Sequence, residues 1–342
     1  MLSIMQRRNP VTIKDIAQTL NISVSTVSRA LRGMPEIHPD TKGAILKLAE
    51  EMDYQPNQLA KNLVGNRTKT IGVIVPALSY YFFASMLNSI EDAAMQAGYS
   101  VMVCQTNESY LREVAQIQNM LNSQVEGFII SLARDSLDYD HINRLIRKQI
   151  PLVLFDRYTD KIESSKVIVD NKQAAFRATM HLIEKGCRRL ACLAGPPHLE
   201  ISNQRLDGFK EAITSSGLQY EEQYVSHSDF TQENTIIQAS NMMSLSNPPD
   251  GILTMSDNIA FSTMYALKQR GLRIPEDVAM VSFNNEPTCM YLTPSLTSIS
   301  QPIREMGTQA VRLLLKQLEA DKIEPETIVL DTQLVIRESS LK

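Results

Sequence analysis

The chain has 342 residues, which at roughly 150 residues per domain predicts two or three domains. Hydrophobic residues make up 43% and charged residues 21%, as in an ordinary globular protein with a sizeable core. The sequence contains no apolar run near the ~18 residues of a membrane span, and no apolar stretch follows Arg7 and Arg8 as in a secretory signal. Four cysteines without paired spacing predict reduced thiols in a cytoplasmic protein, without disulfides, metal or cofactor.

Charge is distributed unevenly along the chain. The net charge is -4, but residues 1–68 contain nine basic and six acidic side chains and so carry +3, which leaves -7 for the other 274 residues. A positive N-terminal segment on an acidic body favours a modular protein with one anionic partner.

Residues 11–54 have the spacing of three short helices. Thr12 and Asp15 form a capping-box pattern at the start of the first helix. Ser23 can cap a second helix over residues 24–31, because its hydroxyl can accept a backbone N–H. Pro39 opens a third helix, which ends before Pro56 because proline disfavours a helical residue before it. We expect residues 1–56 to form one small helical domain.

The first two of these helices fit a helix-turn-helix. Such a pair places its second helix in the DNA major groove, with the N-terminal side chains against base edges. Val24 and Ser25 would contact bases, and Arg29 could bind guanine through two hydrogen bonds. Small hydroxyl side chains suit phosphate contacts, which we expect of Ser23, Thr26 and Ser28, and Thr12 is a further expected DNA contact. The alternative is an ordinary helical hairpin that packs on another part of the chain.

Residues 57–66 could form a further helix, too short to be stable in water without a partner. A second copy of the segment and DNA would together stabilise it. Leu63 could then insert between base steps in the minor groove, with Asn57 and Ala60 as further DNA contacts. The alternative is a polar linker whose apolar residues pack on a domain.

From residue 70 onward, short β-rich runs alternate with amphipathic stretches. Strand–helix alternation over some 270 residues is typical of parallel doubly wound sheets, and the length allows two of them. The expected strands are residues 71–75, 101–103, 128–130, 152–155, 190–193, 251–253 and 278–281, with helices such as 86–97 and 260–270 between them.

Several motifs, in order, resemble those of the lactose/galactose repressor family of bacterial transcription regulators. They are VTIKDIA at 11–17, VSTVSRAL at 24–31, YQPN at 54–57, IGVIVP at 71–76, LAGP at 193–196, RLDGF at 205–209 and LTSISQP at 296–302. The resemblance implies an all-α helix-turn-helix head (1–56), a hinge helix and linker (57–68), and a periplasmic-binding-protein-like α/β core (69–342). It also implies a homodimer that reads a pseudo-palindromic DNA operator.

In that family the core has two doubly wound parallel-sheet lobes, which enclose a small effector. By resemblance, lobe one comprises about residues 69–168 and 299–328, and lobe two about 169–298 and 329–342. The family's effector contacts carry over to these positions: Phe82, Phe83, Asp156, Asp170, Arg205, Phe230, Ser256, Asp257, Asn284 and Gln301.

The chemistry of these side chains suits a carbohydrate-like ligand. Aromatic faces suit the apolar face of a sugar ring, and the Arg205 fork can bind two vicinal hydroxyls, a carboxylate or a phosphate. The alternative for Phe82, Phe83 and Phe230 is core packing, and for Asp156 and Asp257 it is capping at strand ends.

Asn284 departs from the family pattern, which has an aspartate there. An amide offers one acceptor and one donor group, so a vicinal diol would be held less strongly and an acidic ligand repelled less. Leu199 and Ile201 lack the polar groups of purine-binding members, which argues against a purine ligand.

Enzyme motifs are missing from the sequence. It has no phosphate-binding glycine pattern, no nucleophile turn, and no ligand-spaced histidines. We therefore expect a regulator, most simply a repressor of carbohydrate-related genes switched by a small ligand. The competing hypothesis is a small-molecule receptor with no DNA-binding role, which would leave residues 1–66 unexplained.

Overall fold

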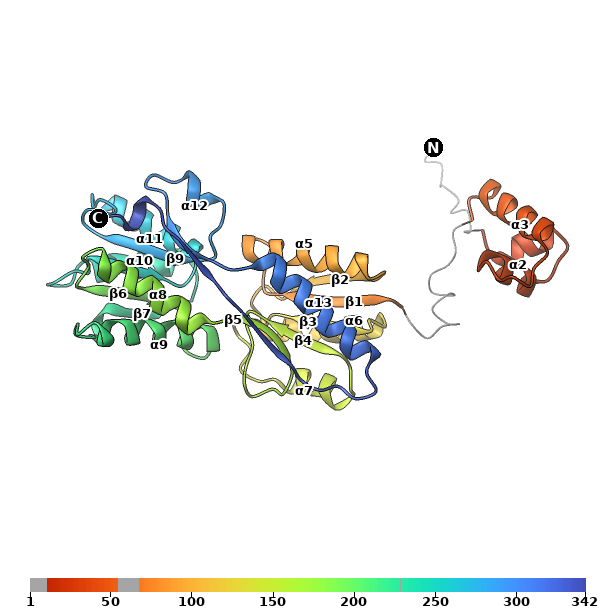
Figure 1. The fold of residues 1–342 in the computed structure, drawn as a ribbon, viewed down its shortest axis with the longest axis horizontal. Helices are drawn as coiled ribbons and strands as arrows, with labels where there is room; N and C mark the ends of the chain where they lie inside the picture. The colour runs from red at the N-terminus through yellow and green to blue at the C-terminus, as the bar shows by residue number, and fades with distance from the viewer. Residues whose placement is uncertain (1–10, 55–67, 228) are drawn as a thin grey trace, which may run out of the picture. The chain divides into compact units, whose positions relative to one another are not determined.

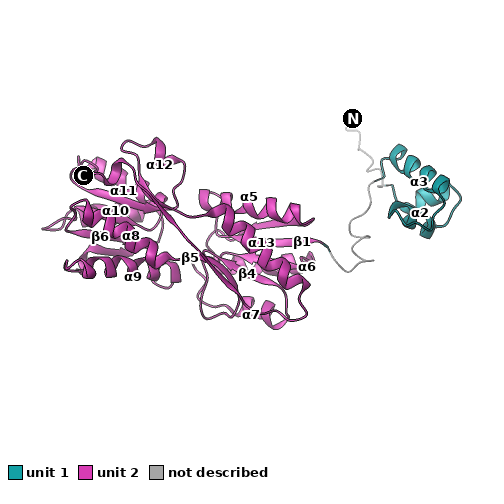
Figure 2. Cartoon of the chain, viewed as in Figure 1, with its two compact units in different colours: residues 1–68 teal, residues 69–342 magenta. Residues whose placement is uncertain are grey.

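The structure is a computed structural model, and it describes residues 11–54, 68–227 and 229–342. The chain divides into two compact units, residues 1–68 and 69–342 (Figure 2). The expected head and linker therefore both belong to the first unit. Three residues for which we expected DNA contacts lie outside the described residues: Asn57, Ala60 and Leu63.

The described part of the first unit is a three-helix domain. Its helices are α1 (Ile13–Thr19), α2 (Val24–Leu31) and α3 (Pro39–Glu51). The Asp15 carboxylate accepts hydrogen bonds from the N–H and the hydroxyl of Thr12, at 2.8 Å each, and Ser23 Oγ accepts the Thr26 N–H at 3.0 Å. The bonds between Asp15 and Thr12 fix the start of α1, and the Ser23 hydroxyl satisfies a backbone N–H at the start of α2. Both caps agree with the sequence patterns. The core of this unit is Ile16, Ala17, Val27, Ala30, Ile45 and Ala49.

The second unit contains two six-stranded sheets (Figure 1). The first has the order β11-β5-β4-β3-β1-β2 and is parallel throughout. Its strands are β1 (Thr70–Val75), β2 (Ser100–Gln105), β3 (Gly127–Ile130), β4 (Leu152–Phe155), β5 (Ser165–Val169) and β11 (Thr327–Leu330).

The second sheet has the order β12-β10-β9-β8-β6-β7, and only β12 is antiparallel to its neighbour. Its strands are β6 (Leu190–Ala194), β7 (Val225–His227), β8 (Gly251–Thr254), β9 (Ala279–Phe283), β10 (Thr297–Ser300) and β12 (Gln333–Val335). Each sheet with its helices is one lobe, and we call them lobe one and lobe two in chain order.

Helices cover the sheets. Lobe one has α5 (Tyr81–Gln96), α6 (Tyr110–Asn122), α7 (Asp140–Arg147) and α13 (Ile303–Glu319). Lobe two has α8 (Asn171–Glu184), α9 (Glu200–Ser215), α10 (Gln232–Met242), α11 (Asp257–Gln269) and α12 (Thr288–Tyr291), with short 3-10 turns at Glu222–Tyr224 and Glu338–Ser340. In lobe one, Ile71 and Val73 pack toward α5 and α13, whereas Ile74 and Phe128 pack toward α6 and α7, so both faces of the sheet are buried.

The chain passes between the lobes after β5, after β10 and after β11; the last of these passages is the blue segment that runs from one sheet to the other in Figure 1. The expected lobe limits at residues 168, 298 and 328 each fall inside one of these strands. The expected limits were approximate, and they lie within two residues of the strand ends at Val169, Ser300 and Leu330.

Helix starts also differ from expectation. Helix α5 begins at Tyr81 and not near residue 86, and α11 begins at Asp257 and not at residue 260. Phe82 and Phe83 therefore lie in the first turn of α5, both buried. Among the described residues, none of the helices combines the length and apolar character of a membrane span.

Candidate functional site

A cavity of about 60 Å³ lies between the lobes of the second unit, and side chains of both lobes line it. Several of its residues directly follow strands: Asp156 follows β4, and Asn284 follows β9. The carboxyl ends of parallel strands are the usual place for ligands in doubly wound sheets. Seven of the residues for which we expected effector contacts meet here: Phe82, Phe83, Asp156, Arg205, Phe230, Ser256 and Asn284.

The other three expected effector residues do not line this cavity. Asp170 caps α8 by accepting the Gln173 N–H at 2.8 Å. Asp257 is buried and accepts hydrogen bonds from the Glu286 N–H at 2.8 Å and the Ser298 hydroxyl at 2.7 Å. Gln301 lies behind Asn284 and donates to its side-chain oxygen at 2.9 Å. Of these three residues, Gln301 supports a lining residue, Asp257 is bonded to residues outside the lining, and Asp170 is exposed.

The cavity also has lining residues that sequence reasoning missed: Tyr80, Arg157, Ile201, Met255 and Asn258. Arg157, Met255 and Asn258 are chain neighbours of expected residues, so their position near strand ends could have identified them as lining residues. Tyr80 precedes α5, whose start was expected later. From the sequence, Ile201 was notable only for lacking polar groups. In the structure, its side chain forms an apolar part of the cavity wall.

Arg205 is held rigidly in the lobe-two wall. Its Nε donates to Asn171 Oδ1 at 2.8 Å and its Nη1 to the Met255 carbonyl oxygen at 2.5 Å. The guanidinium also lies 4.1 Å from the centre of the Phe283 ring. Burial lowers the pKa of Arg205 to about 10, although nearby Asp156 opposes this shift. The side chain is therefore still cationic at neutral pH and lines the cavity as a fixed donor group.

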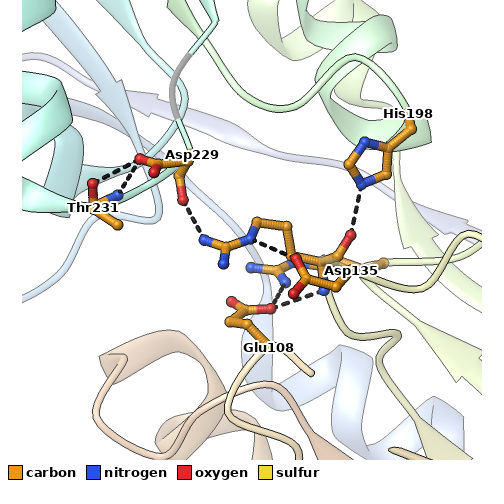
Figure 3. A network of polar contacts seen from close by, with 7 residues as sticks. Glu108, Asp135, His198, Asp229 and Thr231 are labelled. Carbon is orange, nitrogen blue, oxygen red and sulfur yellow. Dashed lines mark hydrogen bonds and ion pairs between the residues drawn. The ribbon is translucent and has the colours of Figure 1, made fainter. Parts of the chain in front are cut away.

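Arg157 forms the wall of lobe one. Its Nη1 donates to Glu108 Oε2 at 2.6 Å (Figure 3). Its guanidinium lies 5.5 Å from the ring centre of Phe83 and 5.8 Å from that of Phe230. Burial raises the pKa of the Glu108 carboxyl, but Arg157 and Arg134 together outweigh burial and the net pKa is lowered. The pair is therefore ionised, and the guanidinium sits between two aromatic rings.

Three lining residues have left-handed backbone conformations: Asp156 with φ 54°, Phe230 with φ 66° and Asn284 with φ 106°. Non-glycine residues rarely adopt positive φ, and such strain gathers at functional sites. Burial also raises the pKa of Asp156, while Arg157 and Arg205 oppose the rise. At Asn284, the oxygen accepts from Gln301, so its amide nitrogen is a donor that the family's aspartate lacks.

In the first unit, α2 presents a polar face. Val24, Ser25 and Arg29 are exposed on it, while Val27 and Ala30 face the core. Ser23 Oγ lies 2.7 Å from the hydroxyls of both Ser25 and Thr26. Thr12 is exposed, and Thr26 and Ser28 are half-buried. The arrangement leaves the N-terminal turn of α2 open to a partner.

No three His, Cys, Asp or Glu side chains gather as a metal site among the residues that the structure describes.

A helical domain with an exposed second helix, joined to two α/β lobes around a cavity, defines a class of protein: a helix-turn-helix domain with a ligand-binding core. Residues 12–57 match the bacterial regulatory proteins of the lacI family, and residues 179–340 match a periplasmic binding protein-like domain.

Full-length relatives agree with these domain matches. The catabolite control protein A of Priestia megaterium is 30% identical over 331 residues, 96% of this chain and 99% of that protein. The lac repressor dimer bound to operator and the anti-inducer ONPF superposes with a TM-score of 0.87 at 25% identity, covering 98% of this chain and 100% of that one. A complex of the regulator CelR with cellobiose has a TM-score of 0.74 at 27% identity, covering 96% and 99%. The chain belongs to the LacI family of bacterial regulatory proteins.

Proposed function

We propose that this chain is a sequence-specific DNA-binding transcription regulator, a repressor of carbohydrate-related genes, whose operator affinity a small ligand switches. The observation that carries the proposal is a cavity walled by both lobes, in a chain that also has a helix-turn-helix domain with an exposed second helix. Relatives of this overall organisation are repressors. The protein acts by binding, not catalysis, as a homodimer in the cytoplasm.

The ligand is carbohydrate-like. Phe82, Phe83 and Phe230 offer aromatic faces to a sugar ring, and Arg205 and Asp156 supply a donor fork and an acceptor for hydroxyl groups. The relative CelR was solved with cellobiose, and a LacI-family regulator from Enterococcus faecium with ribose. The donor amide of Asn284 favours ligands that carry an extra acceptor at that position.

The switch is a population shift between lobe arrangements. Ligand binding changes the closure of the lobes, and thereby the spacing of the two 57–66 segments of a dimer. When the segments separate, DNA affinity falls, and when they approach, it rises. In the DNA complex, Val24, Ser25 and Arg29 contact bases, and Leu63 inserts into the minor groove beside Asn57 and Ala60.

The test begins with DNA. Purified full-length protein is incubated with random duplexes, bound DNA is recovered and sequenced, and the bound sites should converge on a pseudo-palindrome. Thermal-shift screening against sugars, sugar acids and sugar phosphates then identifies the ligand, because a ligand that binds the folded state raises its Tm. A monomeric protein without preference for any site over random fragments would contradict the proposal and favour a receptor without a DNA-binding role.

A further inference from the structure

The segment that follows β3 reaches from lobe one to lobe two beside the cavity. His198 of lobe two donates through Nε2 to the Arg134 carbonyl oxygen at 2.6 Å. The Arg134 guanidinium donates in turn to the carbonyl oxygen of Asp229, also in lobe two (Figure 3). One residue of lobe one therefore bonds two separate loops of lobe two, through its backbone and its side chain.

Lobe one holds this segment in place through two buried carboxylates. Glu108 Oε2 accepts the Arg134 N–H at 2.9 Å as well as the Arg157 guanidinium. Glu113 accepts the Ala133 N–H at 2.6 Å and the Ser136 hydroxyl at 2.8 Å. Because Arg157 lines the cavity, a single carboxylate oxygen joins the cavity wall to the residue that bridges the lobes.

Lobe two is equally constrained at the point of contact. The Asp229 carboxylate accepts the N–H of Thr231 at 3.0 Å and its hydroxyl at 2.7 Å (Figure 3). Phe230, between them, has φ 66° and lines the cavity. The carbonyl that Arg134 contacts is therefore one residue from a cavity-lining ring. A ligand that shifts the backbone of Phe230 would therefore also shift the Asp229 carbonyl.

Apolar contacts close the same boundary. Leu199 and Ile201 of lobe two belong to the buried cluster that contains Leu132 and Tyr158 of lobe one. Gln204 also donates to the Tyr158 hydroxyl at 2.6 Å. The contacts of Arg134 with His198 and Asp229 lie at the exposed edge of this boundary.

We propose that Arg134 and His198 are positioning residues that form an interlobe latch, which stabilises the closed arrangement of the lobes. Through Glu108 and Arg157 on one side and Asp229 and Phe230 on the other, the latch is linked to ligand seating in the cavity. This role rests on the proposed function in one respect: ligand-controlled closure is what the latch regulates.

Hydrogen–deuterium exchange of the full-length protein tests the latch without DNA or ligand. Arg134→Met and His198→Phe each remove one interlobe bond. Loss of one hydrogen bond changes an opening equilibrium by roughly two- to tenfold. We expect His198→Phe to speed exchange in residues 131–139 of the opposite lobe, and Arg134→Met to speed it in residues 229–233, by about that factor.

Conservative variants separate the latch from local structural damage. Arg134→Lys keeps a donor for the Asp229 carbonyl, and His198→Gln keeps one for the Arg134 carbonyl, so both should restore most of the protection. Arg144→Met is the matched control, since Arg144 pairs with Asp140 of its own helix and should leave lobe two unchanged.

The latch is overturned if faster exchange stays within the lobe that carries the substitution, or if Arg134→Lys and His198→Gln exchange as fast as the disruptive variants. If a disruptive variant is too unstable to measure, Arg134→Lys and His198→Gln still test the latch, because both must then exchange about as slowly as the wild type. Failure of the DNA selection would remove the proposed function and would not alter these exchange results.

Discussion

Replacing Glu286 by glutamine should stabilise the protein at high pH and not at low pH. Glu286 follows β9 and is 7% exposed. Its backbone N–H donates to the buried Asp257 carboxylate at 2.8 Å, and Asn258 donates weakly to its side chain at 3.5 Å. Burial, with the nearby Asp257 charge, raises the pKa of Glu286 from 4.5 to about 7. The folded protein therefore disfavours the ionised carboxylate.

The direction of the pH effect follows from proton linkage. Between pH 4.5 and about 7, the folded state retains a proton that the unfolded state has lost, so stability falls as pH rises through this window. A pKa difference of this size corresponds to about 3 kcal/mol above pH 7. Glutamine is neutral and nearly isosteric, so we expect Glu286→Gln to gain roughly 1–3 kcal/mol at pH 8 and close to nothing at pH 4.5.

Thermal denaturation at a series of pH values between 4.5 and 8 measures this difference. Each kcal/mol moves Tm by roughly 2–4 °C in a domain of this size. The exposed Glu276 supplies the control, and Glu276→Gln should follow the wild type at every pH. The reasoning would be refuted if Glu286→Gln raised Tm equally at pH 4.5 and pH 8, or if it lowered Tm at pH 8.

Four further predictions concern the head, the helix packing and a DNA contact. Ser23→Ala removes the N-cap acceptor of α2 and should lower the stability of the head by about 1 kcal/mol in urea denaturation followed by circular dichroism. Gly208→Ala places a methyl group against the Lys172 carbonyl oxygen of α8 and should cost about 1–3 kcal/mol or more; Gly43→Ala, which meets open space in α3, should instead stabilise by about 1 kcal/mol. Arg29→Ala should cost roughly 1–3 kcal/mol at one base pair of the selected duplex in a titration of single-base variants, and a uniform loss would make Arg29 a phosphate contact.

Elements with strong local signals were predicted closely from the sequence. Residues 24–31 and 152–155 coincide with α2 and β4, because a capping serine and a continuous apolar run define them locally. Three of the four edge strands, β7, β11 and β12, were missed, as were the interior strands β5 and β10. Strand β11 pairs with β5, from which more than 150 residues separate it, and β7 has three half-buried or exposed residues. Nothing in their own sequence distinguishes such strands from loops, because they become strands only by pairing with a neighbouring strand.

The start of α5 was missed for a related reason. Two successive buried aromatic residues, Phe82 and Phe83, break the helical periodicity, and no side chain caps the helix at Tyr80. At the site, strand-end positions could be predicted, but their orientation could not. Asp257 and Asp156 each lie directly beyond or near a strand end; only the tertiary structure shows that the first binds Glu286 and Ser298 while the second lines the cavity.

The interleaved course of the chain through both sheets has a consequence for biosynthesis. The first sheet needs β11, and the second needs β12, although most strands of each are made far earlier. Domains fold as units in the order in which they leave the ribosome. The three-helix head can thus mature while some 270 residues are still being translated, whereas the first sheet cannot be finished until the ribosome has passed residue 330, nor the second until it has passed residue 335. A message truncated before residue 327 would yield a competent head attached to two unfinished sheets with unpaired edges.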